Sequence, residues 1–213
     1  MPIEYLSFRE QVRSAVRTSI VTGELVPGKL YPISQISKKL EVSATPVREA
    51  LADLGHAGLV DIVRNRGFVV RELTVHDLDE ILELRLMLEV PAIERLSGHV
   101  GPADQAACSE FVEICRLAAS RGDLQGFLEA DRAFHLRLLE ALHNKRLVQI
   151  VDRLRDETRL LGLPNLAREY QLVASADEHE QLLKAVVSGD EHVGEIISKH
   201  VRHTRGIWAG QAE

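Results

Sequence analysis

An acidic and an imidazole side chain lie four residues apart in the segment Asp131-Arg132-Ala133-Phe134-His135. If this segment is helical, the spacing places the Asp131 carboxylate beside the His135 imidazole on one face, close enough to bind a single cation. Alone, the pair is weakly diagnostic, because an ion pair or a histidine satisfied within the core explains it equally well. His179 and His200 follow further along the chain. The fold decides whether they join the pair.

Arg85 is a second candidate for chemistry, because it interrupts a mainly apolar helical pattern that runs from residue 75 to residue 97. Burying a guanidinium inside an apolar bundle costs free energy unless an anion pairs with it. Its planar shape matches a carboxylate in bidentate fashion. Two interpretations stay open. Arg85 either binds a small organic acid or forms a structural ion pair with Glu83 or Glu89.

A third group of candidate residues lies between residues 34 and 70, where the sequence predicts a helix-turn-helix. Ser34 is expected to cap a short helix, and three residues form the turn that follows it. The second helix is expected to begin with Thr45 as its N-cap and Pro46 at its first position, where the missing N–H costs nothing. Gly58 is expected to end that helix. The two helices would then cross as a DNA-reading pair.

A β-hairpin is predicted directly after this helix pair. Two short apolar runs, residues 59–63 and 68–70, are joined by Arg64-Asn65-Arg66-Gly67. Asn and Gly tolerate the positive φ of a tight turn, so the runs are expected to pair as strands. This hairpin would be the wing of a winged helix-turn-helix.

Arg48 is the predicted base-reading residue. A helix that enters the major groove presents its N-terminal residues to base edges, and an Arg there can contact guanine O6 and N7. The alternative is that Arg48 pairs with Glu49 or Asp53 on a solvated helix face. Other residues are expected to contact DNA phosphates or to place the wing against the DNA backbone or minor groove. They are Lys38, Lys39, Ser43, Thr45, Arg64, Arg66 and Gly67.

The charge of the chain is unevenly distributed. Its formal net charge is −6, which taken alone disfavours a nucleic-acid partner. Residues 1–72, however, hold 10 Lys and Arg against 8 Asp and Glu, a balance of +2, so the other 141 residues hold 16 basic and 24 acidic side chains, or −8. A mildly basic first part joined to an acidic remainder favours two domains with different partners.

The remainder of the chain is expected to be helical. A supporting helix is predicted at residues 5–22, and no strand pattern is found after residue 71. Cys108 and Cys115 are expected to be reduced core thiols. No apolar run approaches the roughly 18 residues of a membrane helix, and residues 1–4 do not resemble a signal peptide, so we expect a cytoplasmic protein without a membrane partner. The six later helices are expected at residues 75–97, 102–120, 123–143, 145–161, 168–188 and 191–209.

The sequence resembles a known family over almost its whole length. The run IVTGELVPGKLYPISQISKKLEVSATPVREALADLGHAGLV, followed by RGFVV, resembles the DNA-binding domain of the GntR family of bacterial transcription regulators. The segments LDEILELRLMLEVPAIERL, DRAFH and SADEHEQLLKAVVSGD resemble the all-helical effector domain called FCD, in its six-helix variety. The expected fold is mainly α, with a winged helix-turn-helix at 1–71, a linker at 72–74 and a helical bundle at 75–213. The family often has Arg at the position of Ala44, so this operator is expected to differ at one base.

The resemblance also implies a metal site. In FCD regulators an Asp and three His from three helices bind a divalent transition metal, here Zn, Ni, Mn or Fe, and the matching residues are Asp131, His135, His179 and His200. His203 is the alternative to His200 as the fourth ligand, because the number of residues between His179 and His200 is slightly smaller than the family pattern implies. Similar regulators bind metabolic carboxylates, which implies an organic acid bridging the metal and Arg85.

The function implied by the resemblance is a ligand-responsive repressor. It would act as a homodimer on a near-palindromic operator in double-stranded DNA, with a small carboxylate as effector. One alternative is a regulator for which the metal itself is the signal. A helical metalloenzyme is less favoured, because Glu140-Ala141-Leu142-His143 is the only Glu-x-x-His motif and no nucleophile elbow or phosphate loop occurs. We therefore expect no enzyme activity.

Overall fold

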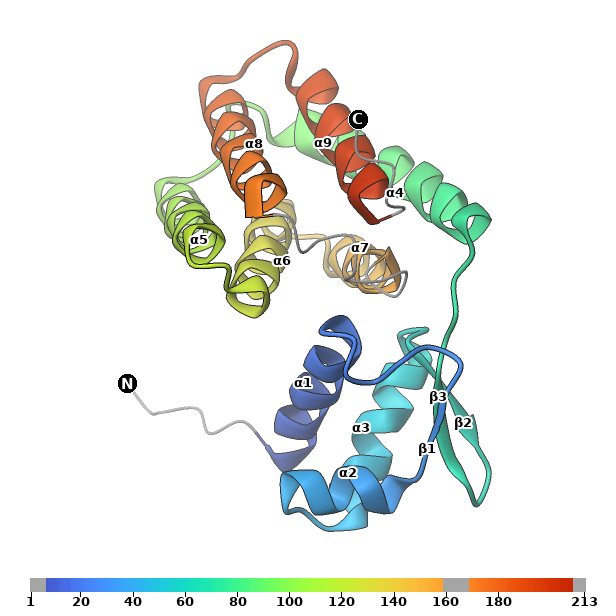
Figure 1. Cartoon of the computed structure of the whole chain (residues 1–213). Coiled ribbons are helices and arrows are strands. Elements are labelled where there is room, and N and C mark those ends of the chain that lie inside the picture. The colour runs from blue at the N-terminus through green and yellow to red at the C-terminus, as the bar shows by residue number, and fades with distance from the viewer. Residues whose placement is uncertain (1–6, 159–168, 209–213) are drawn as a thin grey trace. The chain divides into compact units, whose positions relative to one another are not determined.

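The computed structural model describes the backbone of residues 7–158 and 169–208. The chain divides into two compact units, and the boundary lies between Leu73 and Thr74 (Figure 1). Each unit has a hydrophobic cluster of its own. The units are therefore described separately.

The first unit combines helices with a small antiparallel sheet of order β1-β3-β2. In the sheet, Phe68 of the central strand β3 pairs with Tyr31 of β1 on one side and with Ile62 of β2 on the other. The predicted wing is present as the β2–β3 hairpin, with Asn65 at φ 59° in its turn and Gly67 at φ 137° at the start of β3. The elements of this unit are α1 (Phe8–Val21), β1 (Leu30–Tyr31), α2 (Ile33–Leu40), α3 (Ala44–His56), β2 (Val60–Val63) and β3 (Gly67–Val70).

Three details of this unit differ from the sequence-based expectation. Strand β1 was not expected, since two residues carry no period-2 pattern. The N-cap of α3 is Ser43 and not Thr45, so Pro46 is the third residue of the helix. The missing N–H of proline still costs nothing there, because a backbone N–H at this position has no acceptor within the helix. Helix α2 follows Pro32, and Ser34 lies inside its first turn rather than capping it.

Helix α3 is fixed in place by its buried face. Val47, Ala50 and Leu51 are fully buried in the core that also contains Phe68. Helix α3 is also tied to α1 by Arg9, whose Nε donates to Asp53 Oδ2 at 2.7 Å. The helix is therefore held against both α1 and the sheet, and its N-terminal turn is left exposed.

The second unit contains only helices among residues 74–158 and 169–208. Its first helix begins with the predicted capping box, in which Thr74 and Asp77 each bond the backbone N–H of the other. The predicted continuation of the fourth helix to residue 161 lies outside the described residues. The elements are α4 (Val75–Leu96), α5 (Pro102–Ser120), α6 (Leu124–Glu140), α7 (Lys145–Thr158), α8 (Glu169–Ser188) and α9 (Val193–Trp208).

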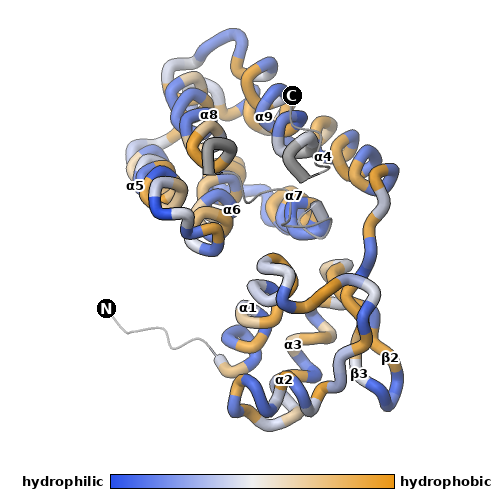
Figure 2. The backbone as a smooth tube through the Cα atoms, in the orientation of Figure 1, coloured by the Kyte–Doolittle hydropathy of each residue, from blue (hydrophilic) through white to orange (hydrophobic). Residues whose placement is uncertain are grey.

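Helix α6 packs against α5, α7 and α4, while α5 also packs against α8 and α4 against α9. Phe134 and Leu138 of α6 are completely buried in the hydrophobic cluster of this unit. Hydrophobic and hydrophilic residues alternate along the helices, as expected for amphipathic helices that bury one face (Figure 2). None of the described helices is long and apolar enough to cross a membrane.

Both cysteines are buried thiols outside any disulfide, as the sequence predicts. Burial raises the pKa of the Cys108 thiol to about 12. The thiolate, which is the nucleophilic form, is therefore disfavoured at neutral pH, and Cys108 serves as a small core side chain.

We predict that Gly67→Ala destabilises the β2–β3 hairpin. A Cβ at Gly67 would overlap the backbone carbonyl of Tyr31 in β1, and the φ of 137° is unfavourable for any side chain. Strain and overpacking together should lower the free energy of unfolding by about 2–5 kcal/mol, measured by urea titration. Gly23→Ala is the control, because Gly23 also has positive φ but has nothing within 4 Å. A loss at Gly67 no larger than at Gly23 would contradict the steric argument.

Candidate functional site

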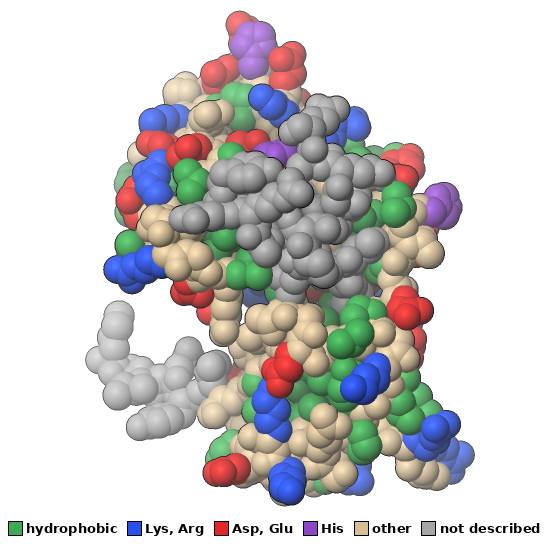
Figure 3. Space-filling view, viewed as in Figure 1, with side chains coloured by type: hydrophobic (Ala, Val, Ile, Leu, Met, Phe, Trp, Pro, Cys, Tyr) green, Lys and Arg blue, Asp and Glu red, His purple; other side chains and the backbone are tan. Residues whose placement is uncertain are grey.

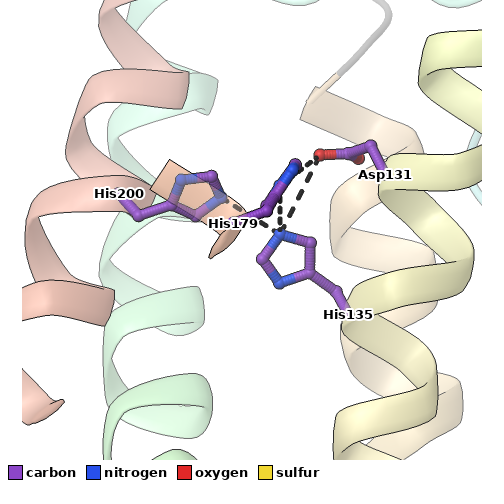
Figure 4. A group of neighbouring side chains, drawn as sticks. All are labelled: Asp131, His135, His179 and His200. Atoms are coloured by element: carbon purple, nitrogen blue, oxygen red, sulfur yellow. Dashed lines mark hydrogen bonds and ion pairs between the residues drawn. The ribbon is translucent and has the colours of Figure 1, made fainter. Parts of the chain in front are cut away.

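Four side chains predicted to bind a metal converge in the core of the helical unit (Figure 4). Asp131 and His135 extend from α6, His179 from α8 and His200 from α9. All four are buried, with exposed fractions of 8%, 2%, 0% and 2%. Three segments far apart in the sequence thus place one carboxylate and three imidazoles at one point.

The four donor atoms lie close enough together to surround a single cation. His135 Nε2 lies 3.1 Å from His179 Nε2 and 3.0 Å from His200 Nε2. Asp131 Oδ1 lies 3.2 Å from His179 Nε2, and one atom from each of the four residues lies within 4.8 Å of the others. A tetrahedral ion with bonds of about 2.0–2.1 Å requires ligand atoms about 3.3 Å apart. Three of the donor distances are close to this value, whereas Asp131 Oδ1 lies 3.9 Å from His135 Nε2. The donor set is therefore compact enough to surround one cation, but it is not a regular tetrahedron.

The environment favours the neutral imidazole, which is the form that binds a metal. Burial, with the nearby Arg155 charge as a second cause, lowers the pKa of His135 well below its ordinary value. Burial also lowers the pKa of His200. Phe134 packs against two of the rings, with centroids 5.1 Å from His135 and 4.8 Å from His179. The neutral rings of His135 and His200 each keep one nitrogen lone pair that a cation can use.

Arg155 of α7 holds the second oxygen of the Asp131 carboxylate. Its Nη2 donates to Asp131 Oδ2 at 2.8 Å, while Asp131 Oδ1 faces the imidazoles. Burial alone would lower the pKa of Arg155, but Asp131 and Glu89 outweigh burial and raise it. Asp131 is therefore fixed by a permanent cation on one side and can give its other oxygen to a metal.

Arg85 forms the ion pair that was one of its two predicted interpretations. Its Nε donates to Glu89 Oε1 at 2.6 Å one turn along α4, and both side chains are at most 3% exposed. Glu89 Oε2 also lies 3.5 Å from Arg155 Nη1. The buried residues thus form a chain from Arg85 through Glu89 and Arg155 to Asp131. Within the described part of the protein, Arg85 Nη2 and Arg155 Nε have no hydrogen-bond partner.

Arg155 and Glu178 were missed by the sequence reasoning. A signal for Arg155 was present, because it lies four residues after buried Val151 and one after buried Leu154, on the apolar stripe of α7. The same kind of interruption pointed to Arg85. Glu178 carries no such signal, since an acidic residue next to a histidine is common on helix surfaces. Among the predicted ligands, His203 lies outside the converging group, and its Nδ1 is 2.7 Å from Glu178 Oε1.

A separate groove in the first unit brings together four of the residues predicted to contact DNA. It has a volume of about 480 Å³ and lies between α3, the start of α2 and the β2–β3 hairpin. Figure 3 shows Lys and Arg side chains on the face where Figure 1 places the hairpin. The predicted residues that line the groove are Arg48, Arg64, Arg66 and Gly67.

The other four predicted residues are exposed but do not line this groove: Lys38, Lys39, Ser43 and Thr45. Lys39 forms an ion pair with Glu24, and its Nζ also lies 3.3 Å from Ser19 Oγ. Arg48 makes no ion pair with any residue that the structure describes, and its suggested partner Asp53 bonds Arg9 instead. Its guanidinium is therefore available to an external anion.

Comparisons with known proteins agree with both units. The model of "Bacterial regulatory proteins, gntR family" matches residues 8–70, and that of the "FCD domain" matches residues 80–203. The HTH-type transcriptional regulator McbR of Escherichia coli (strain K12) is 27% identical over 180 residues, covering 84% of this chain and 80% of that protein. The probable D-xylose utilization operon transcriptional repressor of Paenarthrobacter nicotinovorans is 28% identical over 194 residues, covering 89% and 83%. The solved structure of E. coli McbR/YncC superposes with a TM-score of 0.84 at 23% identity, covering 97% and 99% of the two chains, which shows a shared fold.

We predict that Arg155→Ala strongly destabilises the metal-free protein. Removing one partner of a buried charge pair leaves Asp131 uncompensated, which typically costs about 3–5 kcal/mol. Urea unfolding followed by circular dichroism measures the loss. Arg153→Ala is the matched control on the same helix, because Arg153 is 54% exposed and pairs only with Glu157 among the described residues. Its effect should stay within about 0.5 kcal/mol. Equal losses in the two variants would refute the assigned role of Arg155.

Proposed function

Because the chain belongs to the GntR family of bacterial transcription regulators, in the branch with an FCD domain, we propose that a small organic acid at a metal site controls its DNA binding. The chain is a DNA-binding transcription regulator and not an enzyme. The observation that carries the proposal is the convergence of Asp131 and three histidines inside the FCD domain. The proposed domain limits are residues 1–71 for DNA binding, 72–74 for the linker and 75–213 for effector and metal binding.

For DNA binding, we assign base recognition to Arg48 at the exposed start of α3. Its freedom from ion pairs among the described residues and its place in the groove beside the hairpin support this role. Arg64 and Arg66 would hold the wing against the backbone or minor groove, and Gly67 would shape the hairpin. Phosphate contacts are assigned to Lys38, Lys39, Ser43 and Thr45. Acting on DNA, the protein would work in the cytoplasm.

For metal binding, we assign Asp131 Oδ1 and Nε2 of His135, His179 and His200 as ligands. Mixed nitrogen and oxygen donors suit Zn, Ni, Mn or Fe, and donor distances of 3.0, 3.1, 3.2 and 3.9 Å are compatible with a small divalent ion between them. Such an ion supplies a Lewis-acidic centre that a carboxylate can bind. The metal would add to the compensation that Arg155 gives to the charge of Asp131.

For the effector, we propose a small carboxylate that reaches the guanidinium groups beside the metal site. Arg85 Nη2 and Arg155 Nε are buried donors without a partner in the described structure, and such donors are costly to leave unsatisfied. A planar guanidinium matches the two oxygens of a carboxylate in bidentate fashion. The ion pair of Arg85 with Glu89 supports this assignment, because it holds the guanidinium in place without using all of its donors.

A homodimer on a near-palindromic operator is the proposed assembly, with repression as the proposed outcome. Paired half-sites require two DNA-binding domains related by a two-fold axis. Exposed apolar side chains on the helical domain offer surface for self-association, among them Leu84 and Met87 of α4 and Ile114 and Leu117 of α5. A relative is named as an operon repressor, which favours the same sign of regulation here.

One observation favours a second candidate function, in which the metal is itself the signal. Asp131 and the three histidines together offer four ligand atoms, and four protein ligands that all bound a tetrahedral ion would close its shell, as is typical of structural metal sites. A tetrahedral ion would then leave no position for an acid. An octahedral ion would keep two positions open and would fit the first proposal.

Two substitutions test the division of labour between the domains. Arg48→Ala should weaken specific operator binding by about 1–3 kcal/mol, measured by fluorescence anisotropy at fixed salt, and should leave metal content unchanged. Arg13→Ala is the control, since Arg13 is exposed on α1 and does not line the groove.

His135→Ala should remove bound metal and retain operator affinity in the metal-free state. The wild-type titration should saturate at two chains per operator. Equal damage to both activities by both variants would overturn the assignment.

A thermal-shift screen distinguishes the two effectors. The metal-loaded protein is screened against central-metabolic, sugar and aromatic acids, with the corresponding neutral alcohols and the metal-free protein as controls. An effector acid at about 100 times its Kd should add about 2.7 kcal/mol of stability to the loaded protein alone, and should alter operator affinity. Operator binding that follows metal concentration and ignores every acid would establish the metal as the signal.

A further inference from the structure

Glu178 of α8 connects two histidines of α9, only one of which belongs to the converging group. Its Oε2 lies 2.8 Å from His200 Nδ1, and its Oε1 lies 2.7 Å from His203 Nδ1. Glu178 directly precedes His179, so α8 carries both a proposed ligand and the partner of a second ligand. The carboxylate is mostly buried, with 21% of its side chain exposed.

This contact determines which nitrogen of His200 faces the metal site. A carboxylate oxygen only accepts hydrogen bonds, so His200 Nδ1 must carry the proton and donate it to Glu178. In a neutral imidazole the other nitrogen, Nε2, then has a free lone pair. That Nε2 is the atom that lies 3.0 Å from His135 Nε2. The hydrogen bond thus holds His200 in the tautomer and the orientation that a metal ligand requires.

The same carboxylate keeps His203 away from the site. His203 uses its Nδ1 on the second oxygen of Glu178, and 32% of its side chain is exposed, against 2% for His200. One residue therefore presents His200 to the centre and occupies His203 at the periphery. His203 in turn fixes the second oxygen, which limits rotation of the carboxylate.

We propose that Glu178 is a positioning residue of the metal centre, which sets the tautomer of His200 and selects His200 over His203 as the fourth ligand. The inference rests on the proposed metal function of this site. Glu178 does not contact the metal itself, and it acts through His200. Outer carboxylates of this kind typically contribute about 10–100-fold to metal affinity.

Glu180 provides a matched control on the same helix. It lies two residues after Glu178, and its contacts are with Lys184 and Arg116 rather than with any described histidine. Removal of its carboxylate changes the charge of α8 by the same amount as removal at Glu178. An effect of charge or helix stability alone would therefore appear in both variants.

The test measures Zn²⁺ affinity by competition with a chromophoric chelator, using the full chain. Glu178→Ala should bind Zn²⁺ about 10–100-fold more weakly than wild type, and Glu178→Gln should fall between them, because an amide oxygen still accepts one hydrogen bond. Glu180→Ala and His203→Ala should remain within about twofold of wild type, whereas His200→Ala should lose most of its affinity. Circular dichroism of each metal-free variant checks that it folds.

Long-range ¹H–¹⁵N spectra of the zinc-loaded protein supply a second readout that a merely structural role would not change. Wild type should show His200 protonated at Nδ1 and metal-bound at Nε2, and Glu178→Ala should lose this single form. Zinc affinity in Glu178→Ala equal to that of Glu180→Ala would overturn the proposal, as would a loss in His203→Ala as large as in His200→Ala. A wild-type chain that binds no Zn²⁺ or other divalent ion would instead overturn the metal function on which it rests.

Discussion

The buried carboxylate of Asp131 is the constraint on which the helical domain depends. A charge in a helical core is tolerated only where its oxygens are satisfied, and Asp131 has Arg155 on one oxygen and imidazoles beside the other. Arg155 in turn needs Glu89, which needs Arg85. Helices α4, α6 and α7 are thereby joined through charges, and α8 and α9 join them through the histidines. Few arrangements of these helices satisfy all of these groups together.

Much of the DNA-binding domain could be predicted because its signals are local. Asn65 and Gly67 specify a turn within four residues, and the apolar face of α3 follows from its periodicity. Strand β1 could not be predicted in this way. Its two residues form a strand only because β3 offers an edge to pair with, and that edge is supplied by residues more than thirty positions later. The N-cap of α3 was misplaced by two residues because Ser43 and Thr45 both have the right chemistry, and only the backbone conformation separates them.

The candidate metal site could be predicted in part, for a similar reason. Asp131 and His135 share a helical face by spacing alone, whereas His179 and His200 were assigned only through resemblance to a family. Arg155 and Glu178 depend on which helices pack together, since their partners lie on α6 and α9. The sequence shows that a charged residue interrupts an apolar stripe. It does not show which distant residue compensates the charge.

The two domains use cations in opposite ways, and the strength of each ion pair explains the difference. Lys39 is 45% exposed in its pair with Glu24, and exposed pairs are worth only about 0–1 kcal/mol, so a DNA phosphate can displace the partner at little cost. Arg155 is 3% exposed, and separating it from Asp131 would strand a charge in the core. Surface cations of the first domain can therefore exchange partners with every binding event. The buried cations of the second domain must stay paired, because separating them from their carboxylates would leave an unpaired charge in the core.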